Sequence, residues 1–202
     1  MRNYSHPEEI VAEVFALYER HGHEDYIGEP VSQLEHMSQA ASLADAEGYD
    51  DEVVLAAFFH DIGHLCVSGI EVGSMDGMGN IDHEKLGAAY LLERGFSARL
   101  ANLVSGHVLA KRYLTYKNPE YFDKLSAASR VTLDFQGGVM TEKEAAEFEK
   151  NPDANLIIRM RYWDDEAKLT RVPVNNIAYL KELAVNHLNY NSNIYFPNVK
   201  MI

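Results

Sequence analysis

An unbroken apolar run, Val53 to Phe59, ends directly on the adjacent pair His60-Asp61. A helix that is apolar on every side is normally buried, so this run predicts a helix at the centre of the fold. An imidazole and a carboxylate at the end of a buried helix are costly unless a partner charge holds them. A metal ion suits both side chains, and the sequence therefore predicts a metal site at this helix end.

Composition is compatible with one domain and a sizeable core. The chain has 202 residues, of which 47% are hydrophobic. Its net charge of -13 argues against nucleic acids and anionic membranes as partners, because both would be repelled. The single cysteine, Cys66, excludes an internal disulfide framework and suits a reducing compartment. Segment 1–10 shows no signal-peptide core, and no apolar run reaches the roughly 20 residues that cross a bilayer, so we expect a cytoplasmic protein.

Helix start and stop signals follow one another along the chain. Two sequences, Ser5 to Glu8 and Thr141 to Glu144, predict capping boxes, the first with Pro7 at the first helical position. Four glycines predict a loop over 67–80. Apolar periodicity predicts helices over about 7–21, 31–47, 51–65, 82–94, 97–113, from 118 onward, from 141 onward, 154–168 and 175–188. Because no alternating strand pattern, repeat or linker is found, we expect a single all-α domain over residues 1–202.

Six side chains, most of them on different predicted helices, could complete the metal site. They are four of the nine histidines and two aspartates: His36, His60, His83, His107, Asp61 and Asp164. Nitrogen and oxygen ligands without a thiolate favour iron, manganese or another divalent first-row ion. Six ligands are too many for one tetrahedral zinc and suit two metals, which Asp61 could bridge. Each histidine could instead be an ordinary helix residue, and Asp164 alone would be a solvated one because two acidic residues follow it. Four further histidines are expected at the surface: His6, His21, His23 and His187.

The positions of His36, the pair His60-Asp61 and the distal Asp164 resemble the HD-domain superfamily of metal-dependent phosphohydrolases. His83 and His107 match the subset that binds two metals. Longer segments resemble, more narrowly, the HD-domain mixed-valent diiron oxygenases that cleave carbon–phosphorus bonds: Asp25 to Glu29, Gln33 to His36, His60 to His64, His83 to Lys85, Gly106 to Val108, Ala110 to Leu114, Ala128 to Arg130 and Gln136 to Gly138. The resemblance covers about residues 24–168, the expected core of a single HD domain, and leaves an irregular tail over 189–202.

This resemblance implies two irons in a mixed-valent Fe(II)/Fe(III) state, with dioxygen as co-substrate. It implies that the six side chains above are the metal ligands and that Asp61 bridges the metals. Substrate-side residues are implied around the phosphonate: His64, Lys111, Ser129, Thr132 and Arg161. Tyr26 and Glu29 match a mobile segment whose tyrosine can occupy an iron position and whose glutamate faces the substrate's nitrogen end. With His64, they are the implied catalytic residues.

The residue types fit a phosphonate. Lys111 and Arg161 could neutralise a dianion in this acidic protein, and the hydroxyls of Ser129 and Thr132 could donate to phosphonate oxygens. Ordinary interpretations exist for the same residues. The two cations could be solvated helix charges, and His64 could simply end its helix, where a cation is favoured.

The implied reaction is oxidative cleavage of the C–P bond of a 1-hydroxy-2-aminoethylphosphonate. A trimethylated nitrogen, which has no N–H, would suit aromatic surroundings, and the candidate walls are Tyr26, Tyr162 and Trp163. Three segments more closely resemble family members that act on this form, which gives glycine betaine and phosphate: Glu35 to Met37, Phe58 to His60 and His64 to Cys66. The alternative is the primary amine, which gives glycine and phosphate.

Two other functions would use the same cluster. One is an HD-type metal-dependent phosphohydrolase that attacks a phosphate ester with metal-bound water. The other is a metal-dependent sensor that binds a ligand without turnover. For the enzyme we expect a small organophosphonate as substrate, no nucleic acid or membrane as partner, and a monomer or small homo-oligomer.

Overall fold

The computed structural model describes residues 6–26, 28–66 and 82–195, with the side chains of 192–195 excepted. This part of the chain is built from helices, as predicted, and contains no strand beyond one isolated bridge between Asp25 and Ser32. The helices are α1 (Pro7–His21), α2 (Gln33–Ala46), α3 (Asp51–Phe59), α4 (Ile62–Cys66), α5 (His83–Leu92), α6 (Ala98–Lys117), α7 (Pro119–Lys124), α8 (Ala127–Phe135), α9 (Glu142–Phe148), α10 (Ala154–Glu166) and α11 (Ile177–Tyr195).

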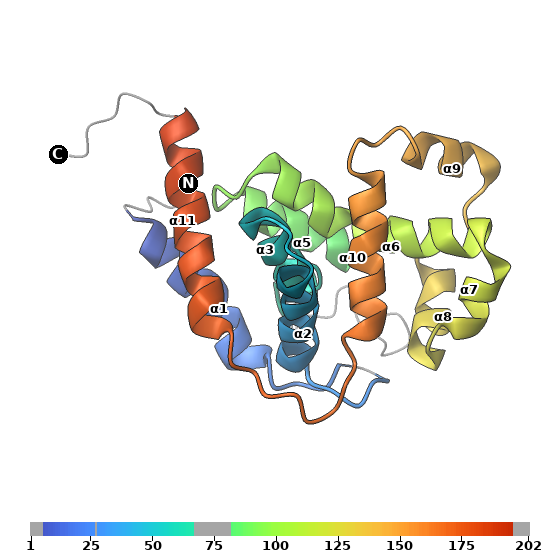
Figure 1. The fold of residues 1–202 in the computed structure, drawn as a ribbon, viewed down its shortest axis with the longest axis horizontal. Helices are drawn as coiled ribbons and strands as arrows, with labels where there is room; N and C mark the ends of the chain where they lie inside the picture. Colours follow the sequence, from blue (N-terminus) through green and yellow to red (C-terminus); the bar gives the residue numbers. More distant parts are fainter. Residues whose placement is uncertain (1–5, 27, 67–81, 196–202) are drawn as a thin grey trace.

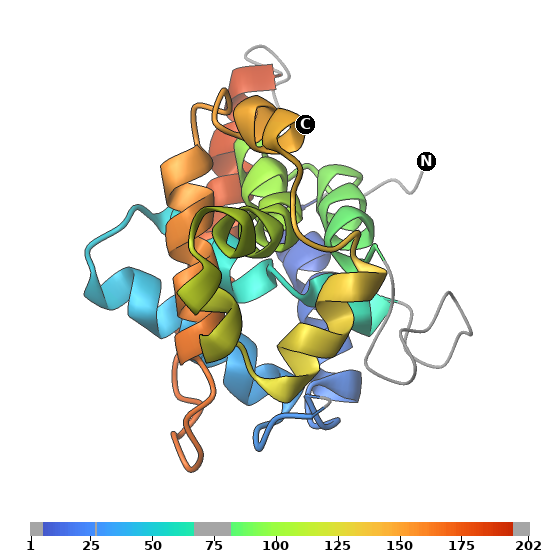
Figure 2. The same ribbon diagram turned by 90° about the vertical axis from the view of Figure 1, so that its right-hand side faces the viewer.

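The apolar helix α3 lies at the centre of the fold. All residues from Val53 to Phe59 are buried, and α3 contacts α2, α6, α10 and α11. Figure 1 shows α1 and α11 on one side of it and α10 on the other. Figure 1 also shows α7, α8 and α9 together at the right-hand side, and this side faces the viewer in Figure 2. The predicted central helix is therefore confirmed, and one main core cluster includes residues of every helix except α7 and α8.

The prediction of one continuous helix over 51–65 is wrong. Helix α3 ends at Phe59, His60 and Asp61 form a turn, and α4 begins at Ile62. The cause lies in α5, against which α4 packs closely. A Cβ atom added to Gly63 would lie 1.9 Å from the carbonyl oxygen of His83. The close backbone contact is possible only at glycine, and it holds α4 against α5.

The first helix begins at Pro7 as predicted, whereas the C-terminal end differs from the sequence prediction. Helix α1 begins at Pro7, and its N-cap is His6, which makes no side-chain capping bond; Ser5 of the predicted box lies outside the described residues. At the other end α11 continues to Tyr195, so the tail predicted to be irregular after residue 189 is helical for part of its length. Asn191 is buried there, and its side chain donates to the Gly95 carbonyl at 3.3 Å.

The remaining predictions have mixed outcomes. The capping box at Thr141 is confirmed. His187 is not a free surface residue, because its Nε2 accepts a hydrogen bond from the Ser97 amide at 3.2 Å. The predicted loop over 67–80 and residues 196–202 lie outside the described part. Among the described residues, no helix is both long and apolar enough to cross a membrane.

Candidate metal centre

The six predicted ligands lie at the points where helices meet around α3. His36 is on α2, His83 begins α5, His107 is on α6 and Asp164 is on α10, while His60 and Asp61 form the turn after α3. All are at most 3% exposed: His36, His60, Asp61, His83, His107 and Asp164. The sequence prediction that these side chains converge is consistent with this geometry. Asp164 is buried, so its alternative interpretation as a solvated residue is wrong.

One group of ligand atoms forms around His36 and His60. The two Nε2 atoms are 3.0 Å apart. Asp164 Oδ1 lies 3.4 Å from the His36 Nε2, and Asp61 Oδ2 lies 3.3 Å from the His60 Nε2. Two imidazole nitrogens and two carboxylate oxygens thus point toward one small space.

A second group forms around His83 and His107. Their Nε2 atoms are also 3.0 Å apart, and Asp61 Oδ1 lies 3.2 Å from the His83 Nε2 and 3.3 Å from the His107 Nε2. The two oxygens of Asp61 therefore face two different histidine pairs. This arrangement can bridge two metal ions through a single carboxylate.

The backbone fixes the orientation of three of these rings. The Nδ1 atoms of His36, His60 and His107 lie 2.8–2.9 Å from the carbonyl oxygens of Ala167, Ala57 and Val104. A carbonyl can only accept, so each Nδ1 carries a hydrogen and Nε2 is the ring nitrogen that faces the cluster. Histidines that bind metals are usually oriented in this way.

The charges of the cluster fit a cation. Burial alone would raise the pKa of Asp61, but the neighbouring His60, His107 and His83 hold it well below its usual value. Burial would lower the pKa of His60, but Asp61 and Asp164 raise it to about 9, so without metal a proton on His60 compensates the carboxylates. Asp164 Oδ1 is buried without a hydrogen-bond partner. A buried acceptor of this kind costs free energy unless a cation or donor reaches it.

His64 also lies in the cluster. Its ring stacks on that of His83 at a centroid distance of 4.0 Å, and one ligand atom each from His64, His83 and Asp61 lie within 4.8 Å of one another. Burial, followed by the charge of His83, lowers the pKa of His64 to about 3. The ring is therefore uncharged near neutral pH, which does not favour a role as a cation at a helix end.

Lys111 and α8 form a polar group beside the cluster. The ammonium of Lys111 is 2% exposed and donates to Thr132 Oγ1 at 2.9 Å and to the Ser129 carbonyl at 3.4 Å. Burial, followed by the nearby Arg161 charge, lowers the pKa of Lys111 to about 7. Lys111 is thus not a solvated helix charge.

Arg161 links this polar group to Asp164. Its guanidinium donates to Asp164 Oδ2 at 2.5 Å and approaches Ser129 Oγ at 3.5 Å. It also donates to the Tyr121 hydroxyl at 2.9 Å and pairs with Asp165. The sequence prediction missed Tyr121 and Asp165; the spacing of four residues between Arg161 and Asp165 was a usable signal, whereas Tyr121 had none.

Tyr26 covers His36. The two rings are stacked at 4.0 Å with an interplanar angle of 13°. Burial, the charges of Asp61 and Asp164, and a hydrogen bond to Asp61 raise the pKa of Tyr26 well above its usual value. The hydroxyl is therefore protonated and directed toward Asp61.

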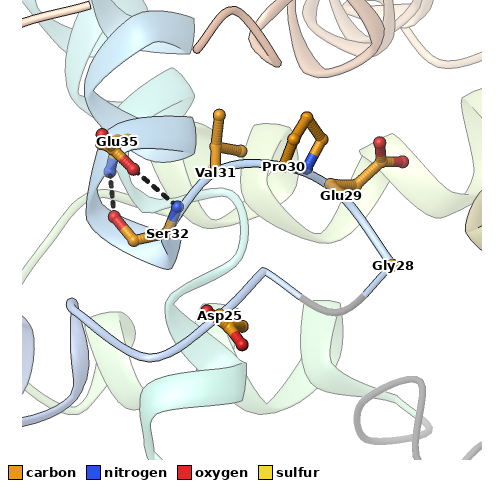
Figure 3. A pocket seen from close by; sticks show the side chains of 7 residues that line it. All are labelled: Asp25, Gly28, Glu29, Pro30, Val31, Ser32 and Glu35. Atoms are coloured by element: carbon orange, nitrogen blue, oxygen red, sulfur yellow. Dashed lines mark hydrogen bonds between the residues drawn. The ribbon is translucent and has the colours of Figure 1, made fainter. Parts of the chain in front are cut away.

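Glu29 has a partner that the sequence prediction missed. Lys168 Nζ donates to Glu29 Oε1 at 2.8 Å, so the carboxylate is already neutralised. On this turn the structure has an open hollow of ≈ 630 Å³ (Figure 3), lined by Asp25, Gly28, Glu29, Pro30, Val31, Ser32 and Glu35. These residues include none of the candidate ligands.

The prediction that Trp163 forms a wall of the substrate site is wrong. It is fully buried, its indole donates to Glu47 at 3.0 Å and its ring packs edge-on against Tyr49. Tyr162 packs edge-on against Tyr121 at 6.2 Å. Of the three predicted aromatic walls, Tyr26 is the one that contacts a candidate ligand.

Comparison with known proteins identifies the family. The HD domain family matches residues 33–134. The chain is 42% identical over 180 residues to an uncharacterized protein of Acanthamoeba polyphaga mimivirus, covering 89% of this chain and 82% of that one. It is 44% identical over 159 residues to a [1-hydroxy-2-(trimethylamino)ethyl]phosphonate dioxygenase (glycine-betaine-forming) of Leisingera caerulea, covering 79% and 80%. It is 39% identical over 171 residues to a hydroxymethylphosphonate dioxygenase of Gimesia maris, covering 85% and 84%.

The family match contains five of the six candidate ligands, and the relatives extend the similarity over most of the chain. The chain belongs to the HD-domain family, within the group of HD-domain oxygenases that includes these phosphonate dioxygenases.

Proposed function

We propose that the protein is a diiron dioxygenase that cleaves the C–P bond of a 1-hydroxyphosphonate. The observation that carries the proposal is the position of Asp61, whose two oxygens face two separate histidine pairs at 3.2–3.6 Å. The two relatives named as phosphonate dioxygenases support the choice of reaction.

The ligands divide into two sets. His36, His60 and Asp164 would hold one iron with Asp61 Oδ2, and His83 and His107 would hold the other with Asp61 Oδ1. Nitrogen and carboxylate ligands suit iron, and the resemblance to the diiron oxygenases supports the mixed-valent Fe(II)/Fe(III) form. When bound, the irons supply Lewis acidity and the redox chemistry that activates dioxygen.

The phosphonate would bind beside Lys111. Ser129 and Thr132 lie within hydrogen-bond reach of this ammonium or of Arg161, so one anion could contact several donors. Arg161 already pairs with Asp164 and Asp165, and Lys111 therefore provides the positive charge that is left for a dianion. A bound phosphonate would favour the protonated form of Lys111.

Residues on the other side of the cluster would position the reacting end. Tyr26 covers His36 and limits the access of water, while His64, stacked on His83, would hydrogen-bond the substrate's 1-hydroxyl. The C1–H and C–P bonds supply the four electrons that reduce dioxygen. One oxygen atom enters the carboxylate and the other enters phosphate.

The leading candidate substrate is the N-trimethylated 1-hydroxy-2-aminoethylphosphonate, giving glycine betaine and phosphate, because one relative at 44% identity carries that name. The primary amine, giving glycine and phosphate, is the alternative. Hydroxymethylphosphonate, the substrate in the name of another relative, has no nitrogen and belongs in the same test.

The test uses protein loaded with Fe(II) in the presence of ascorbate and air. Each of the three hydroxyphosphonates is added separately, and phosphate and the organic product are measured. We expect phosphate release that needs dioxygen. Release under strict anaerobiosis, or hydrolysis of phosphate esters with Mn²⁺, would support the phosphohydrolase instead, and no release from any phosphonate would contradict the proposal.

A further inference from the structure

We infer that Lys168 is a positioning residue of the metal centre, which holds Glu29 and thereby keeps Tyr26 stacked on His36. Only the experiment with iron-loaded protein rests on the proposed function, because the contacts of Lys168 are made within the chain itself. Neither the ligand set nor the phosphonate site includes Lys168.

The first step concerns the turn that carries Tyr26 and Glu29. This turn lies between α1 and α2, and backbone hydrogen bonds hold it within itself and at its two ends. They join amide to carbonyl: Tyr26 to Val31 (2.9 Å), Glu29 to Tyr26 (2.9 Å), Gln33 to Glu24 (3.0 Å) and Leu34 to Gly22 (2.8 Å). These bonds connect the turn to itself and to the ends of the neighbouring helices. None of these four bonds attaches Tyr26 or Glu29 to the metal centre.

The Glu29–Lys168 pair supplies that connection. The donor and acceptor are 2.8 Å apart, and the two side chains are 9% and 15% exposed. Loss of one partner in a mostly buried pair leaves the other charge uncompensated. The same ammonium lies 6.0 Å from the centroid of the Tyr26 ring, at the limit of a cation–π contact. Lys168 therefore acts on Glu29 and Tyr26 together.

Lys168 projects from a fixed base. Its neighbour Ala167 accepts a hydrogen bond from His36 Nδ1 at 2.9 Å, and the Ala167 amide donates to the Trp163 carbonyl at 2.8 Å. On the other side, the Leu169 amide donates to Gln39 at 3.1 Å. Ala167 thus orients the His36 ring, and the next residue, Lys168, helps to hold Tyr26 over that ring. The expected effect of losing Lys168 is a displaced Tyr26 and a more accessible His36.

A metal-free experiment tests this directly in the full chain. Amide hydrogen exchange and the NMR shifts of the His36 ring protons are measured in wild type, Lys168→Met, Lys168→Arg and Glu29→Gln. Lys181→Met is the matched control, because Lys181 pairs with Glu19 at 3.2 Å between two other helices.

In Lys168→Met we expect the Tyr26 and Glu29 amides to exchange about tenfold faster, since local opening depends on few contacts there. The Leu34 amide at the base should be unchanged. The ring-current shift that Tyr26 imposes on His36 should decrease, and Tyr26→Leu provides its lower limit. Glu29→Gln should reproduce both effects, and Lys168→Arg should retain wild-type values. Unchanged exchange and shifts in Lys168→Met, failure of arginine to restore them, or equal changes in Lys181→Met would overturn the inference.

A second measurement uses iron-loaded protein. Under anaerobic conditions, the transfer of Fe(II) to ferrozine should be several-fold faster in Lys168→Met than in wild type or Lys168→Arg. Equal rates in all three would contradict the shielding of His36 by Tyr26. If wild type binds no iron, the proposed function fails, while the metal-free experiment still decides the role of Lys168.

Discussion

At the scale of single residues, Asp61 determines the character of the site. A buried carboxylate normally becomes neutral, but here histidines on both sides keep the pKa of Asp61 well below its usual value. Each oxygen faces its own histidine pair. The cluster is therefore divided into two halves that share one side chain, and removing a ligand from one half should leave the other largely intact.

This division gives a prediction for His83→Ala. The variant should bind about one iron where wild type binds two, because the half formed by His36 and His60 keeps its ligands. Oxygen-dependent turnover should be lost. The iron content by mass spectrometry and the phosphate released in air measure the two effects.

The control for His83→Ala is His6→Ala, since His6 is exposed and makes no capping bond. It should keep both irons and full turnover. Retention of both irons in His83→Ala would show that His83 is not a ligand.

The substitution Lys111→Met should lower phosphonate turnover without destabilising the metal-free protein. The lowered pKa of Lys111, about 7, means that the unfolded chain binds a proton more readily than the folded chain between about pH 7 and 10.5. This group therefore makes the wild type more stable as pH rises through that window. Metal-free Lys111→Met should be at least as stable as wild type at pH 7, and its advantage should shrink by pH 9. Urea unfolding at both pH values measures the difference.

In the same variant phosphonate turnover should fall by a hundredfold or more, on the order expected when a buried charge contact is removed. The matched control is Lys117→Met, whose lysine lies on the same helix and pairs with the exposed Glu149. It should keep wild-type turnover. A Lys111→Met enzyme with unchanged KM and kcat would exclude Lys111 from the phosphonate site.

At the scale of helices, glycine allows α4 and α5 to pack backbone against backbone. A Cβ at Gly63 would meet the His83 carbonyl oxygen at 1.9 Å, whereas a Cβ at Gly106 would meet the side chain of Ile157 at 2.7 Å. A backbone atom cannot move without shifting α5, but a side chain can adopt another rotamer. The two glycines should therefore differ in their tolerance of alanine.

We expect Gly63→Ala to destabilise the protein by about 3 kcal/mol or more and Gly106→Ala by about 1–2 kcal/mol, in the range of overpacked cores. Because α5 begins at His83, Gly63→Ala should also reduce metal binding, while Gly106→Ala should not. Urea unfolding and metal content check both effects. Equal losses of stability in the two variants would contradict the rigid contact between α4 and α5.

Local sequence signals predicted the helices well where their caps are local. The box at Thr141 and the start at Pro119 are read from adjacent residues. The break after Phe59 was missed because its cause, the approach of α5, comes from a distant segment. The same holds for the candidate site: resemblance supplied the ligands, whereas the Glu29–Lys168 pair joins residues 139 positions apart, and no spacing rule could predict it.

At the scale of the whole molecule, the cluster joins helices that are far apart in the sequence. Its side chains come from α2, α5, α6, α10 and the turn after α3. Without metal, the fold must keep two aspartates and their histidines buried in a chain of net charge -13. A cation that binds the folded chain and not the unfolded one stabilises all of these helices together.

Metal removal should therefore lower the melting temperature of the entire protein in one transition. Free metal at 100 to 1,000 times its Kd adds about 3–4 kcal/mol for each site, so two sites correspond to about 20 °C for a chain of this size. Calorimetry with and without a chelator measures the shift. Asp61→Asn is the control, because it keeps the shape of the side chain but weakens both halves of the cluster, and its melting temperature should be nearly insensitive to the chelator. If wild type melted at the same temperature with and without metal, these residues would be buried for packing alone, and the convergence of five segments on Asp61 would need another cause.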